Sequence, residues 1–339
     1  MGGVAVAYQH ARGLVERGHE VTVVAPRRSS GLRGLLLHSA VRVRNRLHGI
    51  RDAPHYTEAG VRTVEVESWE GVTRMGHDAV IGIGHQTLPH ILRILEKEGG
   101  LGVSFIQDGV RHGLPGGGCS WTAPLLRVAV SQWIAAAVEA SGVPVAAVLP
   151  NAVDASVFSL TEPLVERGLR VVALYHRHPV KGPNTLVDTL RRIKNVEPRL
   201  EADVISARPP RHRLPSWVRV HLRPEAAALA ELYNGAAVCL HTSRLEGWGL
   251  VPMEAAACGC AVVATESRGV NEFLVPGRSM RQVSVDDAEG LARETMALLS
   301  DQSFRIRVAN AGIEDVARFS WSDSTSTLER TLLAHLPAS

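Results

Sequence analysis

The chain has 339 residues, of which 45% are hydrophobic and 21% are charged, and this composition excludes a disordered or collagen-like protein. Its length favours two domains, each large enough to bury its own core. The formal net charge is only +3, so overall charge gives no support for a nucleic-acid-binding role.

Short apolar runs of strand length alternate with amphipathic helical stretches along the whole chain, a pattern typical of βα units and parallel sheets. In the first half, strands are predicted at residues 21–24, 79–83, 103–106, 128–130 and 145–149. In the second half, they are predicted at residues 170–174, 202–205, 218–220, 237–240 and 261–264. The sequence therefore predicts an α/β protein with two doubly wound parallel sheets.

The apolar pattern is interrupted between residues 150 and 168, where Pro150 and Pro163 stand among polar and charged residues. We expect an N-terminal domain over residues 1–155 and a C-terminal domain over residues 156–339. Three successive helices are predicted after Asp286, and Ser322 or Asp323 is available to cap the last one. This last helix is expected to close the second domain or to pack back on the first.

Four cysteines are too few for a disulfide framework, and Cys258 and Cys260 lack the two-residue gap of a zinc or redox motif. This cysteine usage favours a reducing, cytoplasmic setting. No segment reaches the roughly 18 uncharged apolar residues that cross a bilayer. The stretch 32–52 combines five arginines with an apolar stripe at helical spacing, which is typical of a solvated basic helix. A peripheral contact with an anionic membrane is the alternative.

The most informative segment begins at Ser243 and contains a short predicted helix. Pro252 suits the first helical turn and Gly259 suits the left-handed position after a helix end, so a helix is expected over about residues 251–258. Gly247 and Gly249 lie just before it, where backbone amides and the helix dipole can receive an anion. This arrangement indicates a phosphate-binding loop.

Two glutamates flank this loop, and two basic residues lie upstream. Glu246 precedes the predicted helix and Glu254 lies within it, so the two carboxylates could accept hydroxyl hydrogen bonds from a sugar and a ribose. Arg177 and Lys181 follow a predicted strand, at the carboxyl edge where open α/β sheets bind ligands. Together they can neutralise a diphosphate without a metal ion. Surface carboxylates and an exposed basic loop are the alternatives.

Taken together, these residues resemble retaining glycosyltransferase family 4 of the GT-B fold, whose hallmark is an E-x7-E motif. Glu246, Glu254 and the flanking glycines match that motif, and Arg177 and Lys181 resemble the family's diphosphate clamp with one residue fewer between them. Residues 151–154 resemble its inter-domain Asn-Gly-Val-Asp signature, with alanine in place of the glycine. The resemblance is most specific over residues 170–274.

The resemblance implies two Rossmann-like domains facing a cleft, a nucleotide-sugar donor, a hydroxyl acceptor, and neither cofactor nor metal. It implies that Glu254 binds the ribose and that Glu246 contacts the donor sugar. It also implies that Arg177, Lys181 and the loop amides hold the diphosphate. The loop residues concerned are Gly247, Gly249, Leu250 and Val251.

The resemblance also assigns residues in the N-terminal half. A histidine after a strand reaches the donor sugar in this family, and His85 is the best match, with His112 second. The chain starts at Met1-Gly2-Gly3, which resembles the family's glycine-rich loop without the strand that leads into it. We therefore expect the native protein to begin upstream, and Gly2 and Gly3 to offer amides to the donor.

The sequence thus predicts a metal-independent, retaining hexosyltransferase whose acceptor is a polysaccharide, glycolipid or natural-product precursor. Two alternatives remain open. One is a nucleotide-sugar epimerase of the same fold, since a phosphorylase would need a pyridoxal lysine context that is not found. The other is an inactive nucleotide-sugar-binding partner subunit, suggested by the short N-terminal region.

Overall fold

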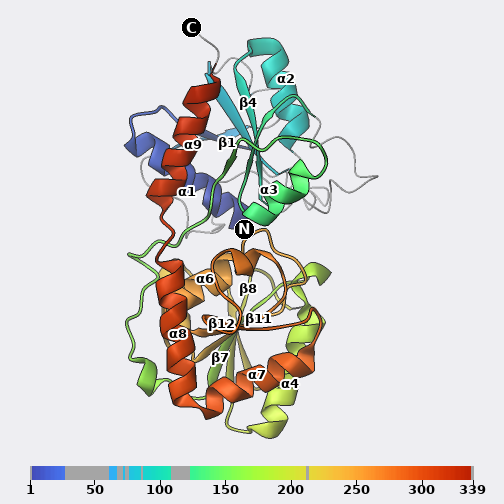
Figure 1. Cartoon of the computed structure of the whole chain (residues 1–339), viewed down its shortest axis with the longest axis vertical. Helices are drawn as coiled ribbons and strands as arrows, with labels where there is room; N and C mark the ends of the chain where they lie inside the picture. Colours follow the sequence, from blue (N-terminus) through green and yellow to red (C-terminus); the bar gives the residue numbers. More distant parts are fainter. Residues whose placement is uncertain are drawn as a thin grey trace. The chain divides into compact units, whose positions relative to one another are not determined.

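The computed structural model describes residues 2–26, 61–66, 72, 76–84, 87–107, 123–210 and 214–336. The chain divides into two compact units, one formed by Met1–Asn151 together with Trp321–Ser339 and the other by Ala152–Ser320 (Figure 1). The division falls in the stretch where the apolar pattern of the sequence is interrupted, and the last helix groups with the first unit.

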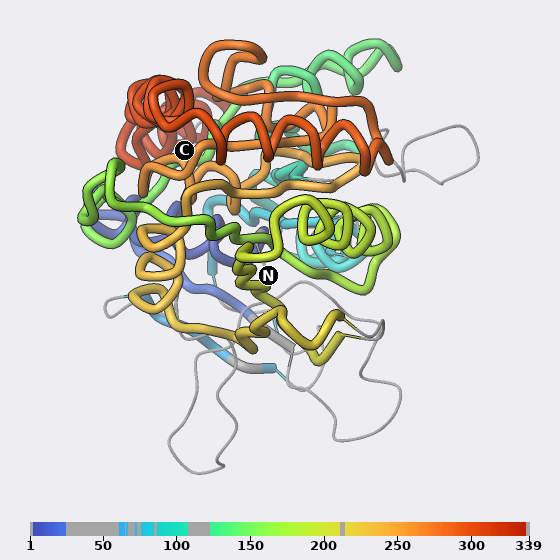
Figure 2. The backbone as a smooth tube through the Cα atoms, turned by 90° about the horizontal axis from the view of Figure 1, so that it is seen from below, coloured from blue at the N-terminus to red at the C-terminus, as the bar shows by residue number. Residues whose placement is uncertain are grey.

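The second unit is built on a six-stranded sheet in the order β12-β11-β10-β7-β8-β9, with every neighbouring pair parallel. Its strands are β7 (Arg170–Tyr175), β8 (Glu201–Ser206), β9 (Val218–Leu222), β10 (Val238–His241), β11 (Ala261–Thr265) and β12 (Met280–Val283). Its helices are α4 (Pro183–Val196), α5 (Ala226–Asn234), α6 (Leu250–Ala257), α7 (Ala288–Ser300) and α8 (Gln302–Val316), with short 3-10 turns η6 (Leu164–Glu166), η7 (Pro179–Lys181) and η8 (Gly269–Glu272). The yellow to gold part of Figure 2 follows the chain from β8 through the edge strand β9 into α5.

The core of this unit follows from the apolar spacing of its helices and strands. Leu186, Leu190 and Ile193 recur at helical spacing along α4, and all three are fully buried against the central strands. The strands β7, β10 and β11 are buried along nearly their whole length, as expected for a parallel sheet covered on both faces. The fold is therefore doubly wound, as the sequence predicts.

Two helix starts in this unit are fixed by aspartates. The Asp287 carboxylate accepts a hydrogen bond from the Gly290 amide at 2.7 Å, and the Asp301 carboxylate accepts one from the Phe304 amide at 2.8 Å. Both are N-caps that satisfy backbone donors left free at a helix start. The last helix begins one residue before the expected caps Ser322 and Asp323, which therefore lie in its first turn.

The first unit contains two parallel sheets among its described residues. One pairs β1 (Thr22–Pro26) with β2 (Arg62–Val66), and the other has the order β3-β4-β5-β6. The strands of the second sheet are β3 (Ala79–Ile83), β4 (Leu101–Ile106), β5 (Leu126–Ala129) and β6 (Ala147–Val148), and the helices of the unit are α1 (Gly2–Glu16), α2 (Leu88–Glu98), α3 (Gln132–Glu139) and α9 (Trp321–His335). Helix α1 contacts both β1 and β3. The expected strand upstream of Met1 stays a prediction.

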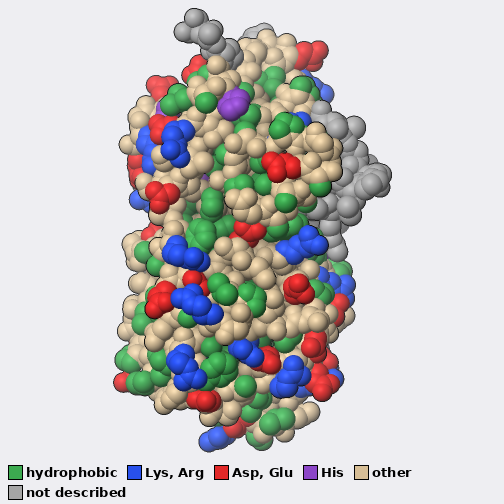
Figure 3. All heavy atoms as spheres, in the orientation of Figure 1, with side chains coloured by type: hydrophobic (Ala, Val, Ile, Leu, Met, Phe, Trp, Pro, Cys, Tyr) green, Lys and Arg blue, Asp and Glu red, His purple; other side chains and the backbone are tan. Residues whose placement is uncertain are grey.

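Charged side chains are mixed on the face drawn in Figure 3, where Lys and Arg stand among Asp and Glu. No helix within the described ranges is both long enough and apolar enough to cross a membrane. The basic stretch 32–52, for which a solvated helix is expected and a membrane contact is the alternative, lies outside the described residues.

Helix α9 lies alongside α1, although more than 300 residues separate them in sequence (Figure 1). A Cβ atom on Gly13 would lie 2.8 Å from the Thr325 hydroxyl, so the two backbones approach more closely there than a larger residue allows. The Arg17 guanidinium donates to the Ser322 carbonyl at 2.8 Å, and His19 pairs with Glu329 at 2.7 Å. The end of the chain is therefore part of the first unit.

At the centre of this helix pair, His10 is buried between the rings of Phe105 and Trp321. Its Nδ1 atom lies 3.2 Å from the Thr325 hydroxyl, and its buried Nε2 atom has no hydrogen-bond partner among the described residues. Burial lowers the pKa of His10 to about 4, because the charged imidazolium would lose its hydration there. The folded state therefore holds His10 neutral.

This burial predicts acid sensitivity of the first unit. Because an unfolded histidine titrates near pH 6.5, stability is lost as pH falls below that value and the loss levels off near pH 4. At pH 5 the cost is about 2 kcal/mol for this side chain. We expect His10→Asn, which keeps a hydrogen-bonding atom near Thr325 but cannot titrate, to lose less stability than wild type between pH 7 and pH 5 in urea unfolding. An equal loss in both proteins would contradict the assignment.

Candidate functional site

Two loops at the carboxyl edge of the second unit's sheet bring Lys181 and Glu246 together. Lys181 ends η7, after β7, and Glu246 lies in the loop after β10. The Lys181 ammonium is 2.7 Å from each of the two Glu246 carboxylate oxygens. This edge is where open parallel sheets bind ligands, because the loops there leave the strands in a common direction.

Gly182 makes this meeting of loops possible. Its backbone is left-handed, with φ of 60°, and a Cβ atom there would lie 2.0 Å from the Thr242 carbonyl oxygen. The Thr242 hydroxyl is within hydrogen-bond distance of the carbonyl oxygens of Lys181 (3.0 Å) and Gly182 (3.2 Å). The loop after β7 is thus fixed to the end of β10, and Lys181 is placed beside Glu246.

Glu246 is an ionised carboxylate whose side chain is only 10% exposed. Burial by itself would raise its pKa, but Lys181, His241 and hydrogen bonds from Lys181 and Ser243 outweigh burial and hold the pKa below its ordinary value. The Ser243 hydroxyl donates to Glu246 Oε1 at 2.7 Å. The site therefore holds a fixed negative charge next to a fixed positive charge.

The start of helix α6 follows immediately. Gly249 is its N-cap, with φ of 107° and no side chain capping the first turn. The first-turn amides, including those of Leu250 and Val251, have no partner within the helix and point out of its N-terminal end. With the helix dipole, they offer partial positive charge to an anion.

The loop that carries Glu246 and Gly247 is packed tightly against η8. A Cβ atom on Gly269 would lie 2.6 to 2.8 Å from backbone atoms of Trp248 and Glu246. Trp248 is buried, stacked on Phe273 with ring centroids 5.4 Å apart, and serves packing. The loop is therefore held on its outer side, which preserves the geometry of Glu246.

Glu254 lies inside α6 and is almost fully buried. One of its carboxylate oxygens, Oε2, accepts a hydrogen bond from the Tyr233 hydroxyl at 3.1 Å. Tyr233 belongs to α5 and is itself inaccessible to solvent. The second glutamate of the motif thus has an orientation fixed by a neighbouring helix.

The remaining predicted residues lie elsewhere. Arg177 follows β7, but its guanidinium donates to the Pro209 carbonyl, in the segment after β8. His85 and His112 lie outside the described residues. Gly2 and Gly3 open α1, and a Cβ atom on Gly3 would lie 2.8 Å from the Gln107 side-chain oxygen at the end of β4.

Three residues at the site were missed by the sequence analysis. Ser243 and His241 contact Glu246, and Tyr233 holds Glu254. Ser243 and His241 carried a usable signal, because both stand at the end of a predicted strand just before the motif. Tyr233 carried none, since its contact with Glu254 depends on how α5 and α6 pack.

Among the residues that the structure describes, no group of three or more His, Cys, Asp or Glu side chains is arranged to hold a metal ion.

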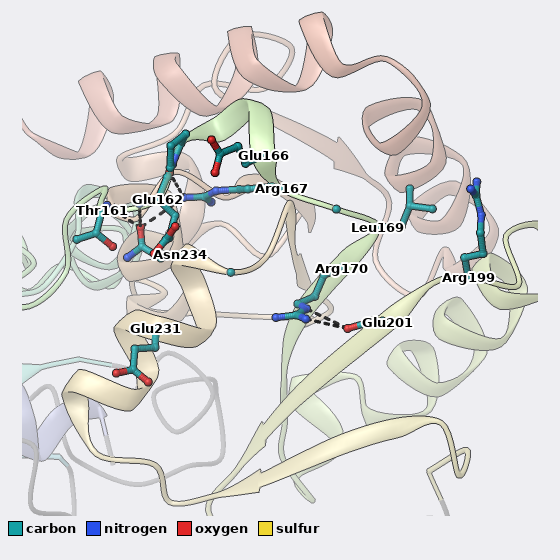
Figure 4. Close-up of a pocket in the computed structure, with 13 residues that line it drawn as sticks. Thr161, Glu162, Glu166, Arg167, Leu169, Arg170, Arg199, Glu201, Glu231 and Asn234 are labelled. Atoms are coloured by element: carbon teal, nitrogen blue, oxygen red, sulfur yellow. Dashed lines mark hydrogen bonds and ion pairs between the residues drawn. The ribbon is translucent and has the colours of Figure 1, made fainter.

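A cavity of about 440 Å³ lies at the opposite, amino-terminal edge of the same sheet (Figure 4). It is lined by the starts of β7 and β8 and by the end of α5. Its main cations are already engaged: Arg167 donates to the carbonyls of Ala236 and Cys258, and Arg170 pairs with Glu201. The cavity is therefore separate from the Lys181–Glu246 pair at the carboxyl edge of the sheet, and that pair marks the candidate site.

Comparison with known proteins agrees with this location. Residues 167–301 match the family model described as glycosyl transferases group 1, so this part of the chain carries a glycosyl transferases group 1 domain. The matched residues include Lys181, Glu246 and Glu254.

Curated relatives match this chain over part of their length. A D-inositol 3-phosphate glycosyltransferase of Stackebrandtia nassauensis is 30% identical over 215 residues, which is 53% of this chain and 47% of the relative. A phosphatidyl-myo-inositol mannosyltransferase of Mycolicibacterium smegmatis is 35% identical over 85 residues, 25% of this chain and 22% of the relative. The matches thus span about half or less of these relatives.

Solved structures show the fold. A sucrose-phosphate synthase of Thermosynechococcus elongatus superposes with a TM-score of 0.71 at 16% identity, covering 96% of this chain and 92% of that one. Anabaena HepE in complex with UDP-glucose gives a TM-score of 0.67 at 18% identity, covering 76% and 79%. The architecture is GT-B, with Rossmann-like parallel-sheet domains, as the sequence predicts.

The contact at Gly182 gives a test of how the site is built. We expect Gly182→Ala to destabilise the protein and to separate Lys181 from Glu246, because the added methyl group would overlap the Thr242 carbonyl. Gly277→Ala is the matched control, since Gly277 also has positive φ, of 82°, but nothing within 4 Å of an added Cβ atom. Its cost should stay near 1 kcal/mol, and thermal melting of both variants measures the difference. Equal melting temperatures would show that the close approach is unimportant.

Proposed function

We propose that this protein is a retaining glycosyltransferase that transfers a hexose from a nucleoside diphosphate sugar to a hydroxyl acceptor. The observation that carries the proposal is the Lys181–Glu246 pair, which stands just before the uncapped start of α6 at the carboxyl edge of the sheet. A cation, a carboxylate and free backbone amides are the groups that a sugar diphosphate needs. The glycosyl transferases group 1 match over these residues supports the same function.

Each group has a distinct role in the proposed reaction. Lys181 and the first-turn amides of α6 stabilise the negative charge that grows on the leaving diphosphate. Glu246 accepts hydrogen bonds from hydroxyls of the donor sugar, and Glu254 from the ribose. Arg177 joins the clamp only after its guanidinium leaves the Pro209 carbonyl, and this partly exposed side chain can then hydrogen-bond water in its place.

Retention of configuration and independence from metal ions belong to the same proposal. With a lysine and a helix terminus at the diphosphate, no divalent cation is required to neutralise the leaving group. We further propose that the leaving phosphate assists deprotonation of the acceptor hydroxyl. HepE was solved with UDP-glucose and several curated relatives are named inositol phosphate glycosyltransferases, so UDP-sugars and inositol phosphates are the first substrates to test.

The function is tested by incubating the protein with UDP-, GDP- and ADP-sugars, with and without acceptors, and measuring free nucleoside diphosphate. We expect release that depends on an acceptor and that persists in EDTA. Isomerisation of the donor without acceptor, detected by chromatography of the nucleotide sugars, would indicate an epimerase, and donor binding without turnover an inactive partner subunit. Loss of activity in EDTA, with rescue by manganese or magnesium, would contradict the metal-free mechanism.

A second prediction concerns the ribose. Glu254→Gln removes charge-assisted hydrogen bonds of about 1.5–3 kcal/mol each, so we expect nucleotide affinity to fall roughly 10- to 100-fold per bond lost. Tyr233→Phe should produce a smaller loss, because it removes one hydrogen bond that orients the carboxylate and leaves its charge in place. The control is Glu231→Gln, an exposed residue of α5 that lines the cavity at the other edge of the sheet. Unchanged affinity in Glu254→Gln would remove Glu254 from the binding site.

A further inference from the structure

His241 is a buried polar side chain that has no role in the proposed reaction as described above. It is the last residue of β10 and is only 4% exposed. Its Nε2 atom lies 3.6 Å from Glu246 Oε1 and has no hydrogen-bond partner in the part of the chain that the structure describes. Buried polar atoms are nearly always bonded, so one left without a partner inside a binding site calls for an explanation.

The explanation starts from the protonation of the unliganded site. Lys181 contacts both Glu246 oxygens and supplies a full counter-charge to that carboxylate. Burial lowers the pKa of His241 to about 4, and nearby Lys181 acts in the same direction, whereas Glu246 acts against it. His241 is therefore neutral at pH 7. In the tautomer that carries its proton on Nδ1, the unprotonated Nε2 faces a carboxylate oxygen, so two acceptors lie opposite each other, and this tautomer accounts for the missing hydrogen bond.

The charged groups that act on His241 among the described residues come from two elements. Glu246 belongs to the loop after β10, and Lys181 belongs to η7. On the side of β11, its neighbour in the sheet is Ala264, which carries no charge. Burial is the largest influence on the protonation of His241, and among the charges it depends on whether Lys181 or another group balances Glu246.

We propose that binding of a nucleoside diphosphate exchanges the partner of Glu246. The Lys181 ammonium turns toward the incoming diphosphate, and His241 takes up one proton from solvent at Nε2 and becomes the cation that faces Glu246. His241 is thus a positioning residue that keeps the Glu246 carboxylate ionised and oriented toward the sugar. This inference rests on the proposed function of the site.

The exchange follows from the charges at the site. A bound diphosphate brings at least two negative charges next to a carboxylate that is 10% exposed, and like charges strongly disfavour each other where water is excluded. One proton on His241 restores a positive charge beside Glu246 without moving the backbone. A closing movement of less than an ångström would convert the 3.6 Å separation into a charge-assisted hydrogen bond.

The experiment is titration calorimetry of the full chain at pH 7 with UDP, GDP or ADP, using whichever binds most tightly. Binding heats are compared in buffers with different heats of ionisation, which gives the number of protons taken up. We expect uptake of about one half to one proton for wild type, and affinity that weakens by up to tenfold per pH unit as the pH rises above neutrality.

His241→Gln keeps a polar group near the position of Nε2 but cannot titrate, so its uptake should be lost while binding is retained. The matched control is His221→Gln. His221 lies on the edge strand β9 and pairs with Asp203, so this variant should leave the uptake unchanged.

Binding without proton uptake in wild type would overturn the inference and leave the proposed function standing. Uptake that persists in His241→Gln and disappears in Glu246→Gln would place the proton on the carboxylate and would also overturn it. Failure of all three nucleotides to bind would count against the proposed function itself. The pH dependence of wild-type affinity gives a test that needs no variant.

Discussion

The ion pair between Lys181 and Glu246 is the constraint on which the rest of the site depends. It joins the loops that follow β7 and β10, which are the two central strands of the sheet. It thereby fixes these loops next to the start of α6. The pair is partly buried, with Lys181 27% and Glu246 10% exposed, so both ions lose part of their hydration and the pair contributes little net stability. The proposed binding role explains its place at this edge better than stability does, since an incoming anion can take over one partner.

The surroundings of the pair are rigid where rigidity is needed. Gly182 and Gly269 allow backbone to touch backbone on either side of the loops, and Trp248 fills the space behind them. Arg244 adds an ion pair to Asp286, at 2.8 Å, from the same loop. The groups that would contact a ligand are therefore preorganised by packing, which lowers the ordering cost of binding.

Most of the second unit could be predicted from sequence because its strands are continuously apolar and its helices strongly periodic. Strand β12 was missed there, as was β2 in the first unit, since Met280–Val283 and Arg62–Val66 mix charged and apolar residues as edge strands do. At the site, the loop glycines were predicted from their place before a helix, and the roles of the two glutamates were expected from the resemblance to a known family. Two side-chain contacts could not be predicted from the sequence: the hydrogen bond from Tyr233 to Glu254, and that from Arg177 to the Pro209 carbonyl. Both arise from packing between segments distant in sequence.

The docking of α9 against α1 has a consequence for synthesis of the chain. The first unit includes the final helix, so its packing cannot be completed until residues beyond 321 have left the ribosome. The second unit is continuous in sequence and has all its residues available earlier. During synthesis the second unit can then fold first, while α1 stays without its partner helix α9. During that interval the apolar and small residues of α1 that α9 later covers are exposed, and chaperones or a second nascent chain can bind them.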